Sequence, residues 1–99
     1  MLATTGTYTG NDTDNRAITG IGFEPSLVII KGDSSDPAVF RTASMIGDNS
    51  FEFGSGRLTP DLIQSLDSDG FTIGFDIAVN TNGITYYYIA IRRETNDPD

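Results

Sequence analysis

The chain contains no cysteine, no histidine and no tryptophan. Without cysteine it can form no disulfide and has no thiol nucleophile, and without histidine a Ser-His-Asp triad is excluded. The same two absences remove the usual ligands of structural zinc and of haem iron. What remains is a chain of 99 residues, 37% of them hydrophobic, which is the length of one domain.

Positive charge is also scarce, with 6 lysines and arginines against 14 aspartates and glutamates and a net charge of −8. Nucleic acids and anionic membranes both attract basic surfaces, so we expect neither as a partner. No apolar run approaches the roughly 20 residues of a membrane-spanning helix. Residues 1–8 lack the basic and apolar regions of a secretory signal, so we expect synthesis in the cytoplasm.

Turn-forming residues recur about every ten positions, between short runs rich in Val, Ile, Thr, Phe and Tyr. This rhythm predicts an all-β fold, a single small antiparallel β-sandwich over residues 1–99, either jelly-roll-like or a flattened barrel. Residues 1–5 and 94–99 are expected to be flexible ends. The predicted strands are Thr4–Thr9, Arg16–Ile21, Leu27–Lys31, Val39–Ala43, Phe51–Phe53, Phe71–Val79 and Ile84–Arg92.

The last two of these strands are predicted to form a hairpin. Apolar residues alternate with small or polar ones along Phe71–Val79, and the following Asn82-Gly83 pair favours a tight hairpin turn. The strand Ile84–Arg92 is apolar on both faces, so we expect both faces to be covered. The second cover would be a loop, a short helix or another subunit. The continuous β-branched run at 27–30 is expected to be the most central strand.

One short helical stretch is predicted near 59–66. Thr59 is a capping residue, Pro60 suits the first helical position, and Asp61 favours the positive end of the helix dipole. The three apolar residues that follow would share one face and close one end of the sandwich.

Three consecutive tyrosines occupy the last predicted strand. Because side chains alternate across a strand, the three are divided between its two faces. We expect Tyr87 to face the core, which leaves on the opposite face an apolar patch of the kind that often marks an interface. An interface and a simple cover of the sheet are both open. The candidate interface residues are Tyr86, Tyr88, Ala90 and Arg92.

Two acidic turns, residues 11–15 and 67–69, supply oxygen atoms of the kind that bind Ca²⁺. The second lacks the glutamate that completes an EF-hand loop, and such residues commonly bond their own backbone in turns, so we expect plain turns and no metal site. The other acids also lie mostly in turns, where no pair stands out for acid–base catalysis. We therefore expect no catalytic residue, no cofactor and no enzyme activity.

Five segments carry a recognisable pattern. They are GTYTGN at 6–11, RAITGIGFEPSLVIIKG at 16–32, FRTASMIGD at 40–48, IQSLDSDGFTIG at 63–74 and VNTNGITYYYIA at 79–90. Together they resemble a β-sandwich module of structural proteins from tailed bacteriophages, which also occurs in some large bacterial surface proteins. The resemblance covers about residues 6–92, and it implies no catalytic residues.

The resemblance implies a structural role in a virus particle. Because the module fills nearly the whole chain, the chain looks most like a capsid decoration, or cement, protein on the exterior of the virion. The expected partners are the major capsid protein and further copies of the chain, with a trimer favoured. The alternative is a glycan- or receptor-binding module of a phage tail or of a bacterial surface.

Overall fold

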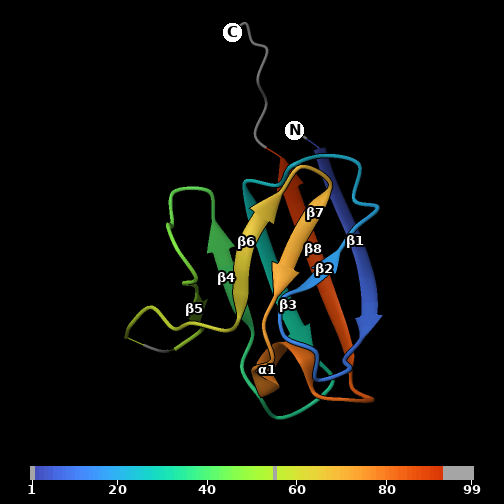
Figure 1. Ribbon diagram of the computed structural model, residues 1–99, viewed down its shortest axis with the longest axis vertical. Coiled ribbons are helices and arrows are strands. Elements are labelled where there is room, and N and C mark those ends of the chain that lie inside the picture. The colour runs from blue at the N-terminus through green and yellow to red at the C-terminus, as the bar shows by residue number, and fades with distance from the viewer. Residues whose placement is uncertain (1, 55, 93–99) are drawn as a thin grey trace, which may run out of the picture.

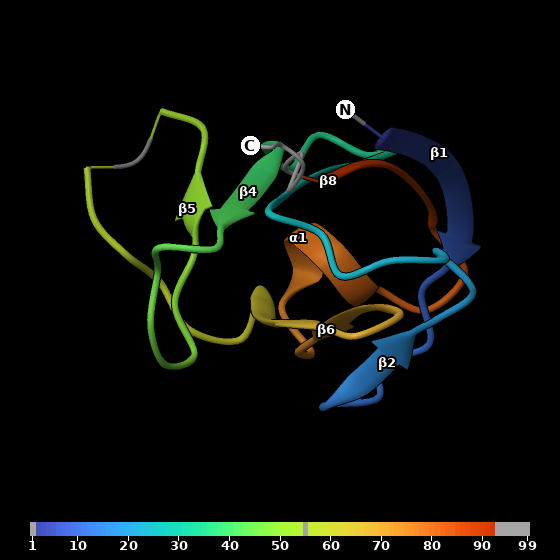
Figure 2. The ribbon, with the colours of Figure 1, turned by 90° about the horizontal axis from the view of Figure 1, so that it is seen from above.

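Two antiparallel sheets face each other in the computed structural model, which describes residues 2–54 and 56–92 (Figure 1). The larger sheet has the strand order β1-β8-β3-β4-β5 and the smaller one β2-β7-β6. Seen from above, the two sheets form separate layers (Figure 2), and Figure 1 shows the short helix α1 at one end of the sandwich, where β7 ends and β8 begins. The elements are β1 (Leu2–Thr9), β2 (Arg16–Ile18), β3 (Leu27–Gly32), β4 (Val39–Thr42), β5 (Phe51–Glu52), β6 (Ile63–Asp67), β7 (Gly70–Ile73), α1 (Ile77–Asn80) and β8 (Thr85–Arg92).

The hydrophobic core lies between the two layers, as the all-β sandwich prediction requires. Within the larger sheet, β3 and β4 bury alternate side chains, and β8 buries Tyr86 and Ala90 on the same face, because successive residues point to opposite faces. Burying one such side chain contributes about 1.5–3 kcal/mol. The largest fully buried hydrophobic side chains are Tyr86, Phe71, Ile30, Leu62, Ile63, Ile73, Val28, Val39 and Val79.

The central strand was predicted correctly. β3 is third of the five strands in the larger sheet and pairs with β4 on one side and with β8 on the other. Val28 and Ile30 point inward and are fully buried, while Ile29 points outward. A continuous β-branched run suits this position because both faces of the strand are lined by apolar neighbours.

The N-terminal end corrects one expectation. Residues 2–5, expected to be flexible, begin β1 and pair antiparallel with β8 from Leu2 opposite Arg92 onward. A neighbouring strand therefore fixes their backbone. Residues 94–99, the other expected flexible end, lie outside the described residues.

The predicted C-terminal hairpin is wrong. β7 ends at Ile73 and pairs with β2 and β6, whereas β8 pairs with β1 and β3 in the other sheet. The chain leaves the strand because Asp76 caps α1, its carboxylate accepting a 2.8 Å hydrogen bond from the backbone N–H of Ala78. The Asn82-Gly83 turn therefore joins a helix to β8, with Gly83 at φ 86°.

The short helix exists, but not near 59–66. Residues 63–67 form β6, which pairs with β7, and Thr59 bridges to Ser50 instead of capping a helix. Asp61 adopts a left-handed backbone, φ 66°, which interrupts any right-handed helix at that point. Leu62 and Ile63 are both fully buried although they are adjacent, because the chain bends here before β6 begins.

Candidate interaction surface

The outer face of the larger sheet carries a continuous apolar row. The strand registers place Ile89 of β8 between Thr5 of β1 and Ile29 of β3, and Ile29 next to Phe40 of β4. Phe40 in turn lies opposite Phe51 of β5. The row therefore crosses all five strands, and the side chains from Ile29 to Phe51 are only partly buried. We call the row and its outward neighbours Leu27, Phe53, Tyr87 and Ile91 the outer face.

An aromatic cluster forms one end of the outer face. The rings of Phe40 and Phe51 stack with centroids 5.6 Å apart, and Phe53 meets Phe40 edge to face at 5.3 Å. Phe53 is 52% exposed. An open hollow of about 270 Å³ lies among these rings, Glu52 and Gly54. Rings already held by one another lose little freedom on binding, which makes them suited to anchor a partner.

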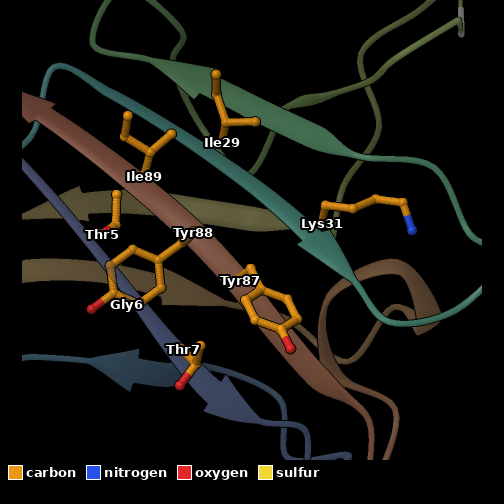
Figure 3. Close-up of a pocket in the computed structure, with 8 residues that line it drawn as sticks. All are labelled: Thr5, Gly6, Thr7, Ile29, Lys31, Tyr87, Tyr88 and Ile89. Atoms are coloured by element: carbon orange, nitrogen blue, oxygen red, sulfur yellow. The ribbon is translucent and has the colours of Figure 1, made fainter.

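A second hollow lies at the opposite end, around Tyr87 (Figure 3). It has a volume of about 410 Å³, and Figure 3 shows residues of β1, β8 and β3 around it. Tyr87 is 56% exposed, between Thr7 of β1 and Lys31 of β3 in the sheet register. Two threonines and one lysine add polar groups to an otherwise apolar wall.

Charge is nearly absent from the outer face. Among the described residues of the larger sheet's five strands, Lys31 is the only charged one at an outward position. Its ammonium group bends away to its own loop, donating to the carbonyls of Gly32 at 2.6 Å and Ser34 at 2.8 Å. On a chain with a net charge of −8, the acidic residues are therefore concentrated elsewhere. A neutral apolar face on an acidic protein is typical of a surface that meets another protein.

The predicted faces of β8 are reversed. Tyr86 and Ala90 point inward and are fully buried, Tyr88 packs against the core, and Tyr87 points outward. The residues predicted as an interface therefore belong to the inner layer, including Arg92, which shares their side of the strand. The physical cause is the phenol group of Tyr86: its hydroxyl donates to the carbonyl of Ile77 and accepts from the N–H of Thr81, both at 2.8 Å.

The buried tyrosines form one cluster beneath the sheet. Tyr8 stacks on Tyr86 with centroids 5.3 Å apart, and Tyr88 meets Phe71 edge to face at the same distance. The hydroxyl of Tyr8 donates to the carbonyl of Val79 at 2.8 Å. Burial raises the pKa of Tyr8, and to a lesser degree Tyr86 raises it further, so this phenol stays protonated. These rings form the layer directly behind the outer face.

Fully buried Asn80 bonds two loops, the one between β1 and β2 and the one that follows β7. Its amide nitrogen donates to the carbonyls of Thr13 at 2.7 Å and Gly74 at 3.1 Å, and its oxygen accepts from the N–H of Asn11 at 2.9 Å. Arg16 also donates to this oxygen at 3.3 Å. All four bonds of the amide are used, as a buried polar group requires.

Buried Arg41 holds another loop. Its guanidinium donates to the carbonyls of Gly47 at 2.6 Å, Asn49 at 2.8 Å and Met45 at 3.1 Å. Desolvation lowers the pKa of Arg41, while Asp48 opposes the change. This arginine bonds internal carbonyl groups and points away from the outer face.

The two turns weighed as calcium ligands bond their own surroundings. Asp69 accepts from the N–H groups of Gly22 at 2.7 Å and Gly20 at 3.0 Å, and these bonds lower its pKa. In the other turn, Asn11 accepts from the N–H of Thr13. The turn at 11–15 therefore bonds its own backbone as predicted, whereas Asp69 of the other turn bonds a loop that is distant in sequence.

Three further carboxylates lie around Gln64. Its amide nitrogen is 3.2 Å from oxygens of Asp14 and Asp48 and 3.5 Å from an oxygen of Asp61. Within residues 2–54 and 56–92, no group of three or more histidine, cysteine, aspartate or glutamate side chains is arranged to hold a metal ion. The site that stands out is therefore the outer face. The sequence indicated that the strand at 84–92 is apolar on both faces, but it assigned the outward side to the wrong set of residues.

Comparison of the chain with models of known protein families, with curated proteins and with solved structures gives no significant match. In the part of the chain that the structure describes, no helix has the length and apolar character needed to cross a bilayer.

Proposed function

We propose that the chain is a non-enzymatic structural protein of a virus particle, a capsid decoration protein that binds the outside of the head through its outer face. The observation that carries this proposal is the surface row across the larger sheet, which is apolar from Ile89 through Ile29 and Phe40 to Phe51 and ends at Thr5 on β1. The partner is the major capsid protein, and the place of action is the exterior of the virion.

Three properties of the outer face support binding to a protein surface. It is apolar and nearly uncharged, so its desolvation costs little. It lies on paired strands whose backbone is already fixed, so little conformational entropy is lost on docking. It also offers two hollows, one beside Tyr87 and one beside Phe53, into which side chains of a partner can fit.

The resemblance to phage structural modules supports the choice of a capsid as partner. The acidic character of the rest of the surface suits a protein displayed in many copies, because like-charged particles repel one another in solution.

A second candidate function is glycan or receptor binding at the hollow around Tyr87. A half-exposed phenol ring beside Thr5 and Thr7 combines a stacking surface with hydroxyl groups, the combination that sugar recognition uses. This reading assigns function to one end of the outer face, whereas the capsid reading uses its whole length.

The test is binding of the purified chain to capsids of the virus that encodes it, prepared without the chain. The proposal predicts saturable addition to the capsids and a higher temperature of capsid disruption. A surface polysaccharide of the host serves as the competing ligand. If the chain ignores the capsids and binds the polysaccharide, the capsid proposal is overturned in favour of the alternative.

A further inference from the structure

We propose that the free edge of β1 pairs antiparallel with β1 of a second copy, so that two larger sheets join into one. This inference is independent of the capsid proposal, because its test uses the purified chain alone. β1 is the edge strand of the larger sheet, and all eight of its residues pair with β8 on the other side (Figure 1).

The direction of the free hydrogen-bonding groups follows from two observed bonds. The N–H of Gly10 donates to Ile84 across the β1–β8 ladder, whereas the carbonyl of Thr9 accepts from Arg16 on the other side. Because the groups alternate along an antiparallel strand, the even-numbered residues bond β8 and the odd-numbered ones face the open edge. Ala3, Thr5 and Thr7 therefore present N–H and C=O groups outward.

The β1 edge lacks the features with which proteins prevent pairing of exposed edges. It carries no charged residue and no proline, and its register with β8 runs without a bulge. The other edges of the described sheets differ: β5 has two residues, β2 has three, and β6 is interrupted by a register shift between Ile63 and Ser65. β1 is therefore the long, regular edge that is open to a partner.

A second copy is the occupant that fits this edge. The side chains of Ala3, Thr5 and Thr7 point to the outer side of the sheet and are exposed, and cross-strand threonine pairs are favourable in sheets. A β1–β1 contact is also neutral, whereas most other contacts between copies bring together surfaces of a chain with net charge −8. The strand is thus complementary to itself in length, charge and shape.

The register of the pairing is also fixed. The carbonyl of Thr9 is already used by Arg16, so the pairing centres on Thr5. Thr5 then lies opposite Thr5 of the second copy, and Ala3 opposite Thr7 of the second copy. Each such pair exchanges two backbone bonds. Because the same strand is used on both sides, the contact is two-fold and closes at a dimer, not at the trimer that the resemblance favours.

The pairing places two outer faces side by side on one extended sheet. A partner that repeats the complementary surface could then bind both at once, and the second contact would form at high effective concentration.

Sedimentation velocity at increasing protein concentration tests the proposal. The unmodified chain should form dimers that dissociate on dilution and strengthen with added salt, because salt screens the repulsion between two acidic copies. Thr5→Pro removes an N–H that faces the open edge without breaking the β8 ladder, and Thr5→Lys adds a charge at the centre of the contact. Each variant should weaken dimerisation at least about tenfold.

Ala17→Lys is the matched control, because it adds the same charge to the exposed position of an edge strand in the other sheet. It should dimerise like the unmodified chain. Thermal melting of each variant separates loss of pairing from loss of folding, and Thr5→Lys carries the test if Thr5→Pro fails to fold.

A chain that stays monomeric up to about 1 mM, the scale of weak association, overturns the proposal. A trimer or dimer that both Thr5 variants leave intact does so as well. A monomer whose binding to capsids is lost in folded Thr5→Pro, which adds no charge to the outer face, would mean that a strand of the capsid protein occupies the edge, which also contradicts pairing between copies.

Discussion

Gly32 of β3 lies directly opposite Tyr86 of β8, and the tyrosine ring covers the space where a side chain at Gly32 would stand. A β-carbon there would lie 2.6 Å from Cε1 of Tyr86. Gly6 of β1 and Tyr88 of β8 repeat the relationship, with a β-carbon 2.5 Å from the tyrosine hydroxyl. Two cross-strand glycines thus let two large rings lie flat against the inside of the sheet.

Gly32→Ala should destabilise the fold by about 1–3 kcal/mol, the usual cost of overfilling a core. The ring of Tyr86 cannot retreat, because it is fully buried and its hydroxyl bonds Ile77 and Thr81. Gly6→Ala is the matched control, since Tyr88 is partly exposed and its ring can tilt aside; it should cost less than about 1 kcal/mol. Urea unfolding measures both, and equal losses would contradict the account.

Asn80→Ala should cost about 2–4 kcal/mol, because it leaves the N–H of Asn11 and the carbonyls of Thr13 and Gly74 without a partner. Asn80→Asp keeps the shape but turns a carboxylate toward two carbonyls, so its stability should recover as the pH falls and the carboxylate is protonated. Asn82→Ala, at an exposed site in the next turn, is the control. A stability loss of Asn80→Asp that is independent of pH would refute this role.

Asp61 and Asp69 should respond to pH in opposite directions. Desolvation, followed by neighbouring carboxylates with Asp48 foremost, raises the pKa of Asp61. Ionisation of Asp61 therefore opposes folding. The protonated carboxyl group contributes its full stability below the pKa of Asp61 in the unfolded chain, and this contribution is lost as the pH rises through the pKa in the folded protein. Asp61→Asn should raise the melting temperature at neutral pH. The gain in the free energy of unfolding should be less than about 1 kcal/mol and should vanish in acid. Asparagine also tolerates the left-handed backbone at this position.

For Asp69 the hydrogen bonds from Gly22 and Gly20 lower the pKa. Its contribution to stability is therefore present above the unfolded pKa and is lost as the pH falls through the folded one. Asp69→Asn should lower the melting temperature at neutral pH and converge with the unmodified chain in acid. Melting curves of both variants between neutral and acidic pH test these two predictions. If Asp61→Asn and Asp69→Asn changed the melting temperature at neutral pH in the same direction, the opposite roles given to the two carboxylates would be contradicted.

The sequence was sufficient for the all-β sandwich and for the central place of β3, because the alternation of apolar residues and the spacing of turns are local signals. It was not sufficient for the faces of β8, because that strand is apolar on both sides and its parity depends on tertiary contacts such as the stacking of Tyr86 on Tyr8 of β1. The helix was misplaced for a related reason. Pro60 and Asp61 suit a helix start locally, but pairing of β6 with β7 outweighs that preference.

The outer face was missed as a consequence of the reversed parity. Ile29 and Ile89 appear in the sequence as ordinary core residues, and only the register of β3 with β8 shows that they meet on the outside of the sheet. Phe40 and Phe51 join them through two further registers. Such a row of residues distant in sequence has no local signature, so it requires the tertiary structure.

The central claim is that the outer face binds the capsid, and Ile89→Lys tests it most directly. Ile89 lies in the row between Thr5 and Ile29, so a charge there places an unpaired ammonium group in the contact. Ser68→Lys adds the same charge in the exposed turn between β6 and β7, in the other sheet. The measurement is the affinity of each folded variant for capsids that lack the chain. We predict a loss of at least about tenfold for Ile89→Lys and none for Ser68→Lys; equal affinity of Ile89→Lys and the unmodified chain would contradict the claim.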